Sequence, residues 1–337
     1  IGIIASMFTA LVITRLIVNA FYAVGLRSEK LYYRPKKERE PINFLSKKKV
    51  FFTISLVLIA AGVITIGVNA GRGKGAFAYS LEFQGGTSTN VTFDKDYSID
   101  EIDKKIVPVV EKVTGDNNVQ TQKVAGTNQV IIKTVTLDLD KREALNKAMV
   151  DNFGVDESKI TAENISSTVS NEMRRDAVIA VVIATICMLL YIWFRFKDIR
   201  FATSAVLALL HDVLVVVGFY AIARISVGNT FIACMLTIVG YSINATIVIF
   251  DRIREEMRGK TKSSDVAAVV NKSITQTLTR SIYTSLTTFI MVAVLYVMGV
   301  SSIKEFALPL MVGVVCGAYS SVCITGALWY VMKRFKK

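Results

Sequence analysis

Seven long apolar segments dominate this sequence, and each has about the length that a helix needs to cross a lipid bilayer. A hydrocarbon core roughly 30 Å thick takes about 20 residues of helix. Several segments also carry Gly, Ala, Ser or Thr at spacings that let helices approach closely in lipid. The segments are residues 1–26, 50–70, 177–194, 201–223, 230–250, 282–300 and 306–332. The sequence therefore predicts an α-helical polytopic membrane protein with seven spans.

The distribution of Lys and Arg predicts the orientation of these spans. The chain has a formal net charge of +13, which in a soluble protein would indicate a nucleic-acid partner. The basic residues are instead concentrated in alternate connections: nine in residues 27–49, three in 195–200, seven in 251–281 and four after residue 332. Basic loops stay in the cytosol. We therefore expect the N-terminus of this chain outside, the C-terminus in the cytosol, and no nucleic-acid partner.

The long connection over residues 71–176 is then extracytoplasmic, and its pattern is that of a folded α+β domain. A strand is expected over residues 79–93, broken at Gly85-Gly86, and a last strand over 160–169. Between them we expect a hairpin of residues 118–124 and 128–135 around 125–127. Helices are expected over 98–114, with Ser98 and Glu101 at the spacing of a capping box, and over 139–153. The order βαββαβ is that of a ferredoxin-like domain.

The remaining polar segments predict no further domain. Residues 27–49 read as a basic cytosolic linker and 333–337 as a basic cytosolic tail. Residues 251–281 fit a short amphipathic helix on the cytosolic surface, and docking of a partner there is an equal alternative. The first residue is Ile and no charged segment precedes the first apolar one, so we expect a piece of a longer chain rather than a signal peptide.

One acidic residue, Asp212, lies deep inside a predicted span, beside the single histidine, His211. Ionisable groups are costly in lipid, so each is first examined for a function. Desolvation favours the protonated form of a carboxylate, which makes proton or ion binding feasible. The alternative is a structural Asp that is hydrogen-bonded to a neighbouring helix.

Two further polar positions are candidates. Asn244 lies in a polar cluster within the fifth segment, where it either holds helices together or lines a hydrated path. Arg280 opens the sixth segment, and it either reaches the membrane interface or balances a buried Asp. Arg15 in the first segment is a weaker case of the same kind.

The sequence offers little for an enzyme, a metal or a cofactor. Gly85-Gly86-Thr87 lacks the Lys and the following helix of a phosphate-binding loop, so we interpret it as a strand bulge. No Ser/His/Asp set, metal cluster or pair of catalytic carboxylates is apparent. The four cysteines all lie in apolar segments, which favours small buried side chains over a disulfide or zinc site. They are Cys187, Cys234, Cys316 and Cys323.

Several of these stretches resemble a known family. Residues 240–244 (GYSIN), 246–250 and 251–255 (DRIRE) are similar to the signature of the SecF protein-export membrane subunit. Further stretches resemble the same family and follow one another in the order expected for it. They are residues 82–87 (EFQGGT), His211-Asp212-Val213, 271–285, 306–308 and 317–321. The resemblance covers roughly residue 44 to the end.

Residues 1–22 resemble the last span of the companion subunit SecD, so the chain looks like the C-terminal part of a fused SecD–SecF protein. The resemblance implies a bundle of the resistance–nodulation–division type: residues 1–26 from the SecD-like half, 50–70 as the first SecF-type span, and five more within 177–332. It implies a bacterial plasma (inner) membrane location and help to preproteins late in export, driven by a proton or sodium gradient. The implied partners are a SecD-like half, the Sec translocation channel, unfolded preprotein and membrane lipids.

The implied coupling residues are Asp212, Arg280 and the position after Asn244. There the family pattern has Asp and this chain has Ala245, which cannot bind a proton or a cation. Either the coupling carboxylates lie in the upstream part, or the ion or mechanism differs, or the residue was changed deliberately. Two other functions remain: a passive scaffold of the translocation channel without ion flux, and a small-molecule or lipid exporter of the same superfamily, which would usually carry a larger outer domain.

Overall fold

The computed structural model describes residues 2–28, 40–72, 75–116, 119–124, 126–258, 265–299 and 301–334. The chain divides into two compact units, Ile1–Glu40 and Pro41–Lys337, and each is described by itself. Most of the predicted basic linker, residues 29–39, lies outside the described residues, as does residue 125 in the predicted hairpin turn.

The first unit is one apolar helical run. It consists of α1 (Gly2–Phe8), the π-helical turn η1 (Thr9–Ile13) and α2 (Thr14–Ala23). Its two threonine hydroxyls donate to backbone carbonyls of the same helix, Thr9 to Ala5 at 2.9 Å and Thr14 to Thr9 at 3.1 Å. A helix that satisfies its own polar groups in this way suits a lipid environment.

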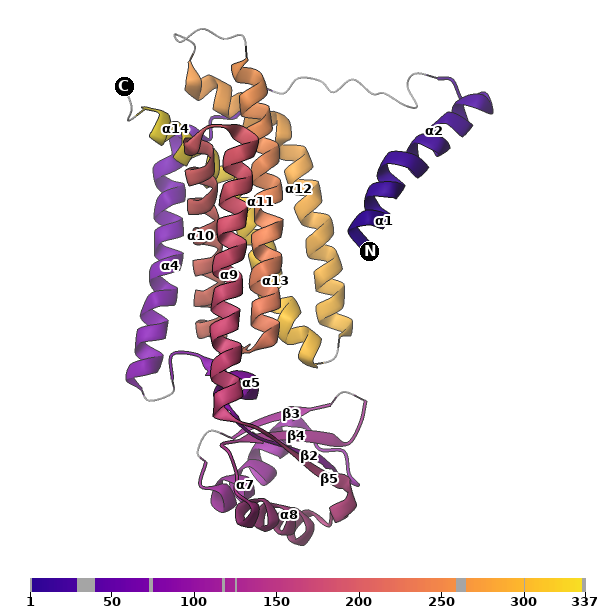
Figure 1. Ribbon diagram of the computed structural model, residues 1–337, viewed down its shortest axis with the longest axis vertical. Helices are drawn as coiled ribbons and strands as arrows, with labels where there is room; N and C mark the ends of the chain where they lie inside the picture. The colour runs from indigo at the N-terminus through magenta and orange to yellow at the C-terminus, as the bar shows by residue number, and fades with distance from the viewer. Residues whose placement is uncertain are drawn as a thin grey trace. The chain divides into compact units, whose positions relative to one another are not determined.

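The second unit contains a bundle of six long helical segments (Figure 1). They are α4 (Lys48–Gly71), α9 (Ser167–Phe196), α10 (Ile199–Ala223), α11 (Asn229–Met257), α12 (Val266–Met298) and a last segment built from α13 (Ser301–Tyr319), η5 (Ser320–Thr325) and α14 (Gly326–Arg334). Together with the helix of the first unit, seven helices of the described chain are long and apolar enough to cross a membrane. The prediction of a polytopic helical membrane protein is confirmed.

The helices are longer than the apolar segments that predicted them. Residues 251–257 belong to α11 and residues 266–281 to α12, so the described part of the segment 251–281 has no separate amphipathic helix, and that prediction was wrong. Residues 259–264 of this segment lie outside the described ranges. The polar first half of α12 is helical because its hydroxyls and amide face the bundle: Asn271, Ser273, Thr275 and Thr277 are all buried.

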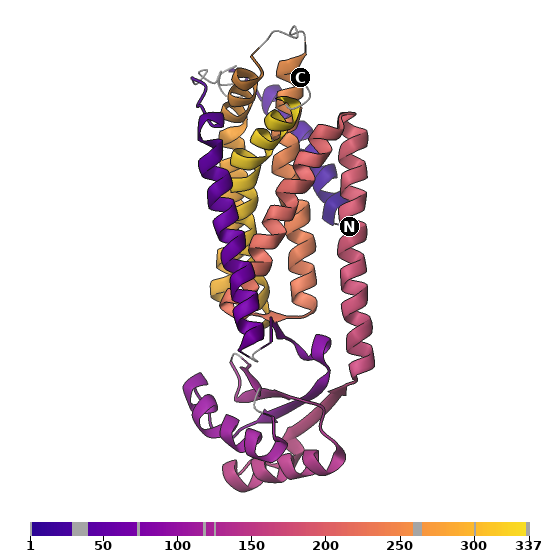
Figure 2. The same ribbon diagram turned by 90° about the vertical axis from the view of Figure 1, so that its left-hand side faces the viewer.

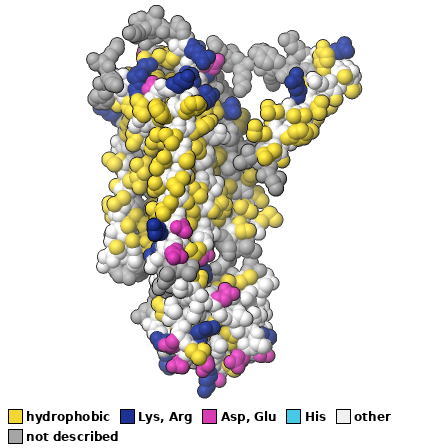
Figure 3. Space-filling model, in the orientation of Figure 1, with side chains coloured by type: hydrophobic (Ala, Val, Ile, Leu, Met, Phe, Trp, Pro, Cys, Tyr) yellow, Lys and Arg dark blue, Asp and Glu magenta, His cyan; other side chains and the backbone are white. Residues whose placement is uncertain are grey.

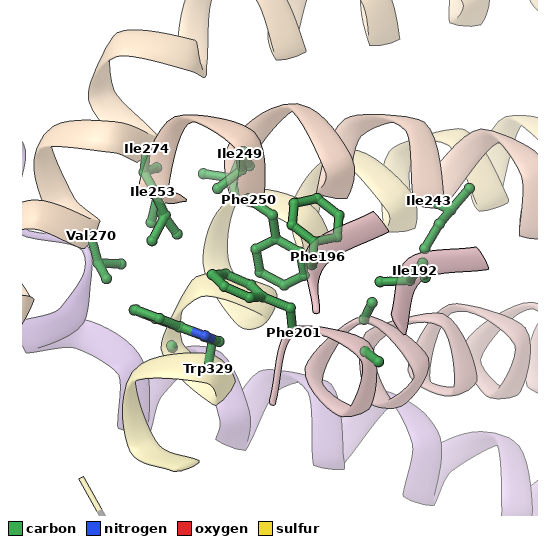
Figure 4. Packing of buried hydrophobic residues seen from close by; sticks show 14 of the residues in the cluster. Ile192, Phe196, Phe201, Ile243, Ile249, Phe250, Ile253, Val270, Ile274 and Trp329 are labelled. Atoms are coloured by element: carbon green, nitrogen blue, oxygen red, sulfur yellow. The ribbon is translucent and has the colours of Figure 1, made fainter. Parts of the chain in front are cut away.

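Close helix contacts and aromatic packing hold the bundle together. A Cβ added to Gly62 in α4 would come 2.6 Å from the Cα of Gly218 in α10, so only glycine fits at this crossing. Near the α9–α10 connection, Phe201 stacks on Trp329 at 4.8 Å between ring centroids and meets Phe250 edge-on at 4.7 Å (Figure 4). Figure 3 shows hydrophobic side chains over the middle of the bundle, with Lys and Arg gathered at the end away from the small domain.

The small α+β domain between α4 and α9 follows the predicted order of elements. Its antiparallel sheet has the strand order β3-β4-β2-β5. The elements are β2 (Gly86–Thr92), a helical run of α6 (Ile99–Glu101), η3 (Ile102–Ile106) and α7 (Val107–Thr114), β3 (Gln120–Lys123), β4 (Gln129–Thr134), α8 (Leu139–Phe153), η4 (Glu157–Lys159) and β5 (Ile160–Ile165). Figure 1 shows α7 and α8 on one face of the sheet, where they share its apolar core.

The expected capping box is present at the start of α6. The Ser98 side chain accepts from the backbone N–H of Glu101, and the Glu101 carboxylate accepts from the backbone N–H of Ser98. These hydrogen bonds, with help from the Lys105 ammonium, lower the pKa of Glu101 to about 2. The carboxylate therefore stays charged, which suits the N-terminus of a helix.

Both ends of the predicted sheet need correction. Residues 79–85 do not continue β2: Ala78–Tyr79 form the short strand β1, and Leu81–Gln84 form one helical turn, α5. Gly85 ends this turn at φ 73°, so Gly85-Gly86 is a helix-to-strand turn and not the expected bulge. The last strand stops at Ile165, because α9 already begins at Ser167 and rises from there as one unbroken helix (Figure 2).

Candidate functional site

Asp212 lies fully buried near the middle of α10 and binds side chains from two other segments. Its Oδ2 accepts hydrogen bonds from the Ser242 hydroxyl of α11 at 2.5 Å and from the Ser320 hydroxyl of η5 at 2.7 Å. Its Oδ1 lies 2.9 Å from Nδ1 of His211. We call these four residues the Asp212 cluster. It joins three membrane-spanning segments through one carboxylate.

The close packing of small residues brings the segments together at this point. Gly317 faces Ser242, and a Cβ at Gly317 would come 3.3 Å from the Ser242 Cβ. The π-helical η5 begins at Ser320, one turn further on. A π-helical turn shifts the following side chains relative to an α-helix and is frequent at functional sites. Ser320, the first residue of this turn, lies against the carboxylate.

His211 is the less satisfied member of the cluster. The imidazole is buried, and its Nε2 has no hydrogen-bond partner among the described residues. The ring of Tyr319 lies 6.2 Å away, and the Tyr319 hydroxyl donates to the carbonyl of Phe51 in α4 at 2.8 Å. A buried carboxylate with a histidine at hydrogen-bond distance is an arrangement that can bind or release a proton.

The other candidates lie at a second place. Asn244, Ala245 and Arg280 line a cavity of about 90 Å³ between α11 and α12. None of the hydrogen bonds and ion pairs of the described residues joins Arg280 to Asp212. Arg280 is the fifteenth of the 33 residues of α12, so it does not open that helix as the sequence suggested. The structure thus separates the predicted coupling residues into two sites.

Ser242 and Ser320 are the members of the site that sequence reasoning missed. Ser242 belongs to the polar cluster of residues 240–246, in which Asn244 was the predicted site residue. Residues two apart point about 200° away from each other on a helix, so only one of the two can face Asp212. Knowing which face of α11 is buried would have selected Ser242, which is 2% exposed, over the exposed Asn244.

A junction connects α10 to the small domain. The loop after α10 contains β6 (Ser226–Val227), which pairs in parallel with β1, the strand that leads into α5 and β2. Glu82 of α5 accepts from the backbone N–H of Asn229 at 2.9 Å, at the start of α11. A shift of α10 against α11 would therefore act directly on the base of the small domain.

Comparisons with known proteins show which family this chain resembles. A family model described as "Protein export membrane protein SecD/SecF, C-terminal" matches residues 145–335. The "Protein translocase subunit SecF" of Petrotoga mobilis is 36% identical over 88% of this chain and 98% of its own length. The "Protein translocase subunit SecDF" of Thermus thermophilus is 32% identical over the whole chain but only 44% of its own length.

This chain is also similar to solved structures of SecDF. The crystal structure of SecDF from Thermus thermophilus, described as a translocon-associated membrane protein, superposes with a TM-score of 0.80 at 29% identity. The match covers 99% of this chain and 44% of that one, so the chain spans less than half of the SecDF relatives. The bundle, the inserted α+β domain and these matches together place the chain in the SecD/SecF protein-export membrane family.

Proposed function

We propose that this chain is a non-enzymatic accessory subunit of the Sec protein-translocation machinery. It promotes the late stage of preprotein export across the bacterial plasma membrane and uses a proton or sodium gradient. The names of the SecF and SecDF relatives support the Sec pathway, and so does the description of the SecDF structure as translocon-associated. A SecD-like half, the translocation channel, unfolded preprotein and membrane lipids are the proposed partners.

The observation that carries ion coupling is the Asp212 cluster. The carboxylate of Asp212 is completely withdrawn from solvent and accepts from hydroxyls of α11 and η5. Protonation removes the charge that holds both hydroxyls, so the contacts among the three segments differ between the two charge states. A membrane potential supplies roughly 2.3 kcal/mol per charge per 100 mV, which is enough to shift such an equilibrium.

The β1–β6 junction provides the connection to the exported chain. In this proposal the small domain, residues 71–176 by prediction and 86–165 by the strands of its sheet, lies outside the membrane and contacts the emerging preprotein. The bundle end with Arg195 in the last turn of α9 and Arg200 in the first turn of α10 lies in the cytosol, following the positive-inside rule. The N-terminus of the chain is then outside and the C-terminus cytosolic.

The test is preprotein export into inverted membrane vesicles with the Asp212→Asn variant. Asn keeps the volume and one acceptor oxygen, so the helices still pack, but the group no longer titrates. We expect export at least several-fold slower than wild type and no further loss when the gradient is collapsed. Asp251→Asn is the matched control, because Asp251 pairs with Arg195 at the exposed end of the bundle and exposed pairs contribute little. Normal gradient-dependent export by Asp212→Asn would overturn the assignment.

A passive scaffold of the channel is the second candidate, because the Arg280 cavity contains no carboxylate to take up a cation. Ion flux in proteoliposomes separates the two functions. Gradient-driven flux that depends on Asp212 supports coupling, and its absence in the protein with all its natural segments supports the scaffold.

A further inference from the structure

The cavity between α11 and α12 has the composition of an anion site. Its volume of about 90 Å³ is enough for a monatomic ion and water. The lining side chains come from one face of each helix, within two turns of α11 and two turns of α12. They are Tyr241, Asn244, Ala245 and Val248 of α11 and Arg280, Ser281, Thr284 and Ser285 of α12.

Three hydroxyl groups around this cavity have no hydrogen-bond partner among the described residues. They are the hydroxyls of Tyr241, Ser281 and Ser285. Ser281 is 5% and Ser285 8% exposed, so bulk water does not reach them easily. An unmet buried donor is costly, and more so in a membrane protein, where solvent cannot substitute.

The neighbouring threonines show that this is not a general property of α12. The hydroxyls of Thr277 and Thr284 donate to the carbonyls four residues earlier, Ser273 and Arg280, at 2.9 and 2.8 Å. This is the usual way in which a hydroxyl is satisfied in a membrane helix. Ser281 and Ser285 have the same option and do not take it. Their hydroxyls remain available to a ligand in the cavity.

Arg280 gives the cavity its charge. It is the only ionisable side chain among the eight lining residues with a charge at neutral pH, and a guanidinium stays protonated. No hydrogen bond or ion pair of its guanidinium occurs within the described ranges. The Arg280 side chain is exposed on the surface of the bundle beside the cavity, and a positive charge on a membrane-spanning helix is strongly unfavourable in lipid without a counter-charge. None of the four lining residues of α11, among them Ala245, carries a negative charge.

We propose that this cavity binds a small monovalent inorganic anion, chloride being the abundant one. The anion accepts from the Arg280 guanidinium, from the hydroxyls of Ser281 and Ser285, and from the Tyr241 hydroxyl at the opposite wall. A cation is disfavoured, because the guanidinium repels it and no lining carboxylate attracts it. One anion neutralises one arginine, so the lining of the cavity carries no net charge in lipid. This site is independent of the Asp212 cluster and of the proposed function.

Bromide is the probe, because it replaces chloride and scatters anomalously. Crystals of the purified protein, produced with all the sequence that its gene encodes and soaked in sodium bromide, should show a bromide peak between α11 and α12 next to Arg280. Binding of radioactive chloride to the same protein should saturate, and bromide should compete. A cavity without a bromide peak, or chloride binding that does not saturate, would overturn the proposal.

Variants identify the residues. Arg280→Gln should weaken chloride binding at least about ten-fold, and Ser285→Ala by a smaller factor, because charge-assisted hydrogen bonds are the stronger ones. Thr287→Ala is the matched control on α12: its hydroxyl donates to the Tyr283 carbonyl at 2.9 Å and lies outside the cavity lining. Chloride binding unchanged in Arg280→Gln contradicts the site.

Ala245→Asp is the reciprocal test. A carboxylate on Ala245 enters the cavity and supplies a permanent counter-charge to Arg280, so halide binding should be lost. The variant should remain folded and no longer gain thermal stability from chloride, whereas wild type should melt higher in chloride than in gluconate. Chloride binding by Ala245→Asp at wild-type affinity would overturn the proposal. Because the readout is equilibrium binding, its failure says nothing about export.

Discussion

The Asp212 cluster and the Arg280 cavity share one wall, α11, and they treat polar groups in opposite ways. On one face of α11, Ser242 donates to a buried carboxylate, and the helices close tightly around the contact. On another face, Tyr241 and Asn244 border a cavity in which hydroxyls meet no acceptor. A carboxylate inside the membrane is an acceptor, so the neighbouring hydroxyl groups can donate to it. A guanidinium is itself a donor, so the hydroxyl groups around it have no acceptor until an anion binds.

Removing the charged group at each site should give the largest difference in stability between the two sites. Asp212→Ala leaves the hydroxyls of Ser242 and Ser320 and the Nδ1 of His211 without their shared acceptor. We expect the free energy of unfolding to fall by about 2–3 kcal/mol. Arg280→Leu in chloride-free buffer removes an uncompensated charge, so the change should stay below about 0.5 kcal/mol or be stabilising.

Denaturant unfolding in detergent, followed by the fluorescence of Trp193 and Trp329, measures both variants. Equal losses for Asp212→Ala and Arg280→Leu would contradict the contrast, because they would mean that Arg280 already has a protein partner.

Enlarging a side chain should also destabilise the protein more at the Asp212 cluster than at the Arg280 cavity. Gly317→Val places its side chain against Ser242, where even a Cβ approaches within 3.3 Å, so we expect a loss of about 2 kcal/mol from overpacking. Ala245→Val also enlarges a side chain to valine, but next to an open cavity, and should change stability by less than about 0.5 kcal/mol. Melting temperatures of the two variants, compared in one detergent, test the difference. A similar drop for both would show that the cavity is closed in the native protein.

The contrast also explains which parts of the structure the sequence could predict. Apolar length predicted all seven spans, and turn residues with Ser98 and Glu101 predicted the order of the small domain. These features are local, and each depends on one segment. Asp212 could be selected because an acid is unusual in an apolar segment, wherever its partners lie.

What could not be predicted depends on the rotation of one helix against another. Ser242 and Asn244 are equally polar in sequence, and only packing against α10 and η5 decides that Ser242 meets Asp212. The extent of α12 was missed because its polar first half was interpreted as part of a short amphipathic helix on the cytosolic surface, whereas those side chains are buried against neighbouring helices. The β1–β6 pairing joins residues about 150 positions apart, and two-residue strands leave no periodicity to read.

The smallest expected effect comes from a matched pair of serines, one at each site. Ser242→Ala removes a 2.5 Å hydrogen bond to a buried carboxylate, for which we expect a loss of about 1 kcal/mol. Ser285→Ala in chloride-free buffer removes a buried hydroxyl that has no partner, so stability should be unchanged or slightly higher. Adding chloride should then stabilise wild type more than Ser285→Ala but stabilise wild type and Ser242→Ala equally. If chloride stabilises Ser242→Ala as weakly as Ser285→Ala, the two sites are not independent, and α11 transmits the state of one to the other.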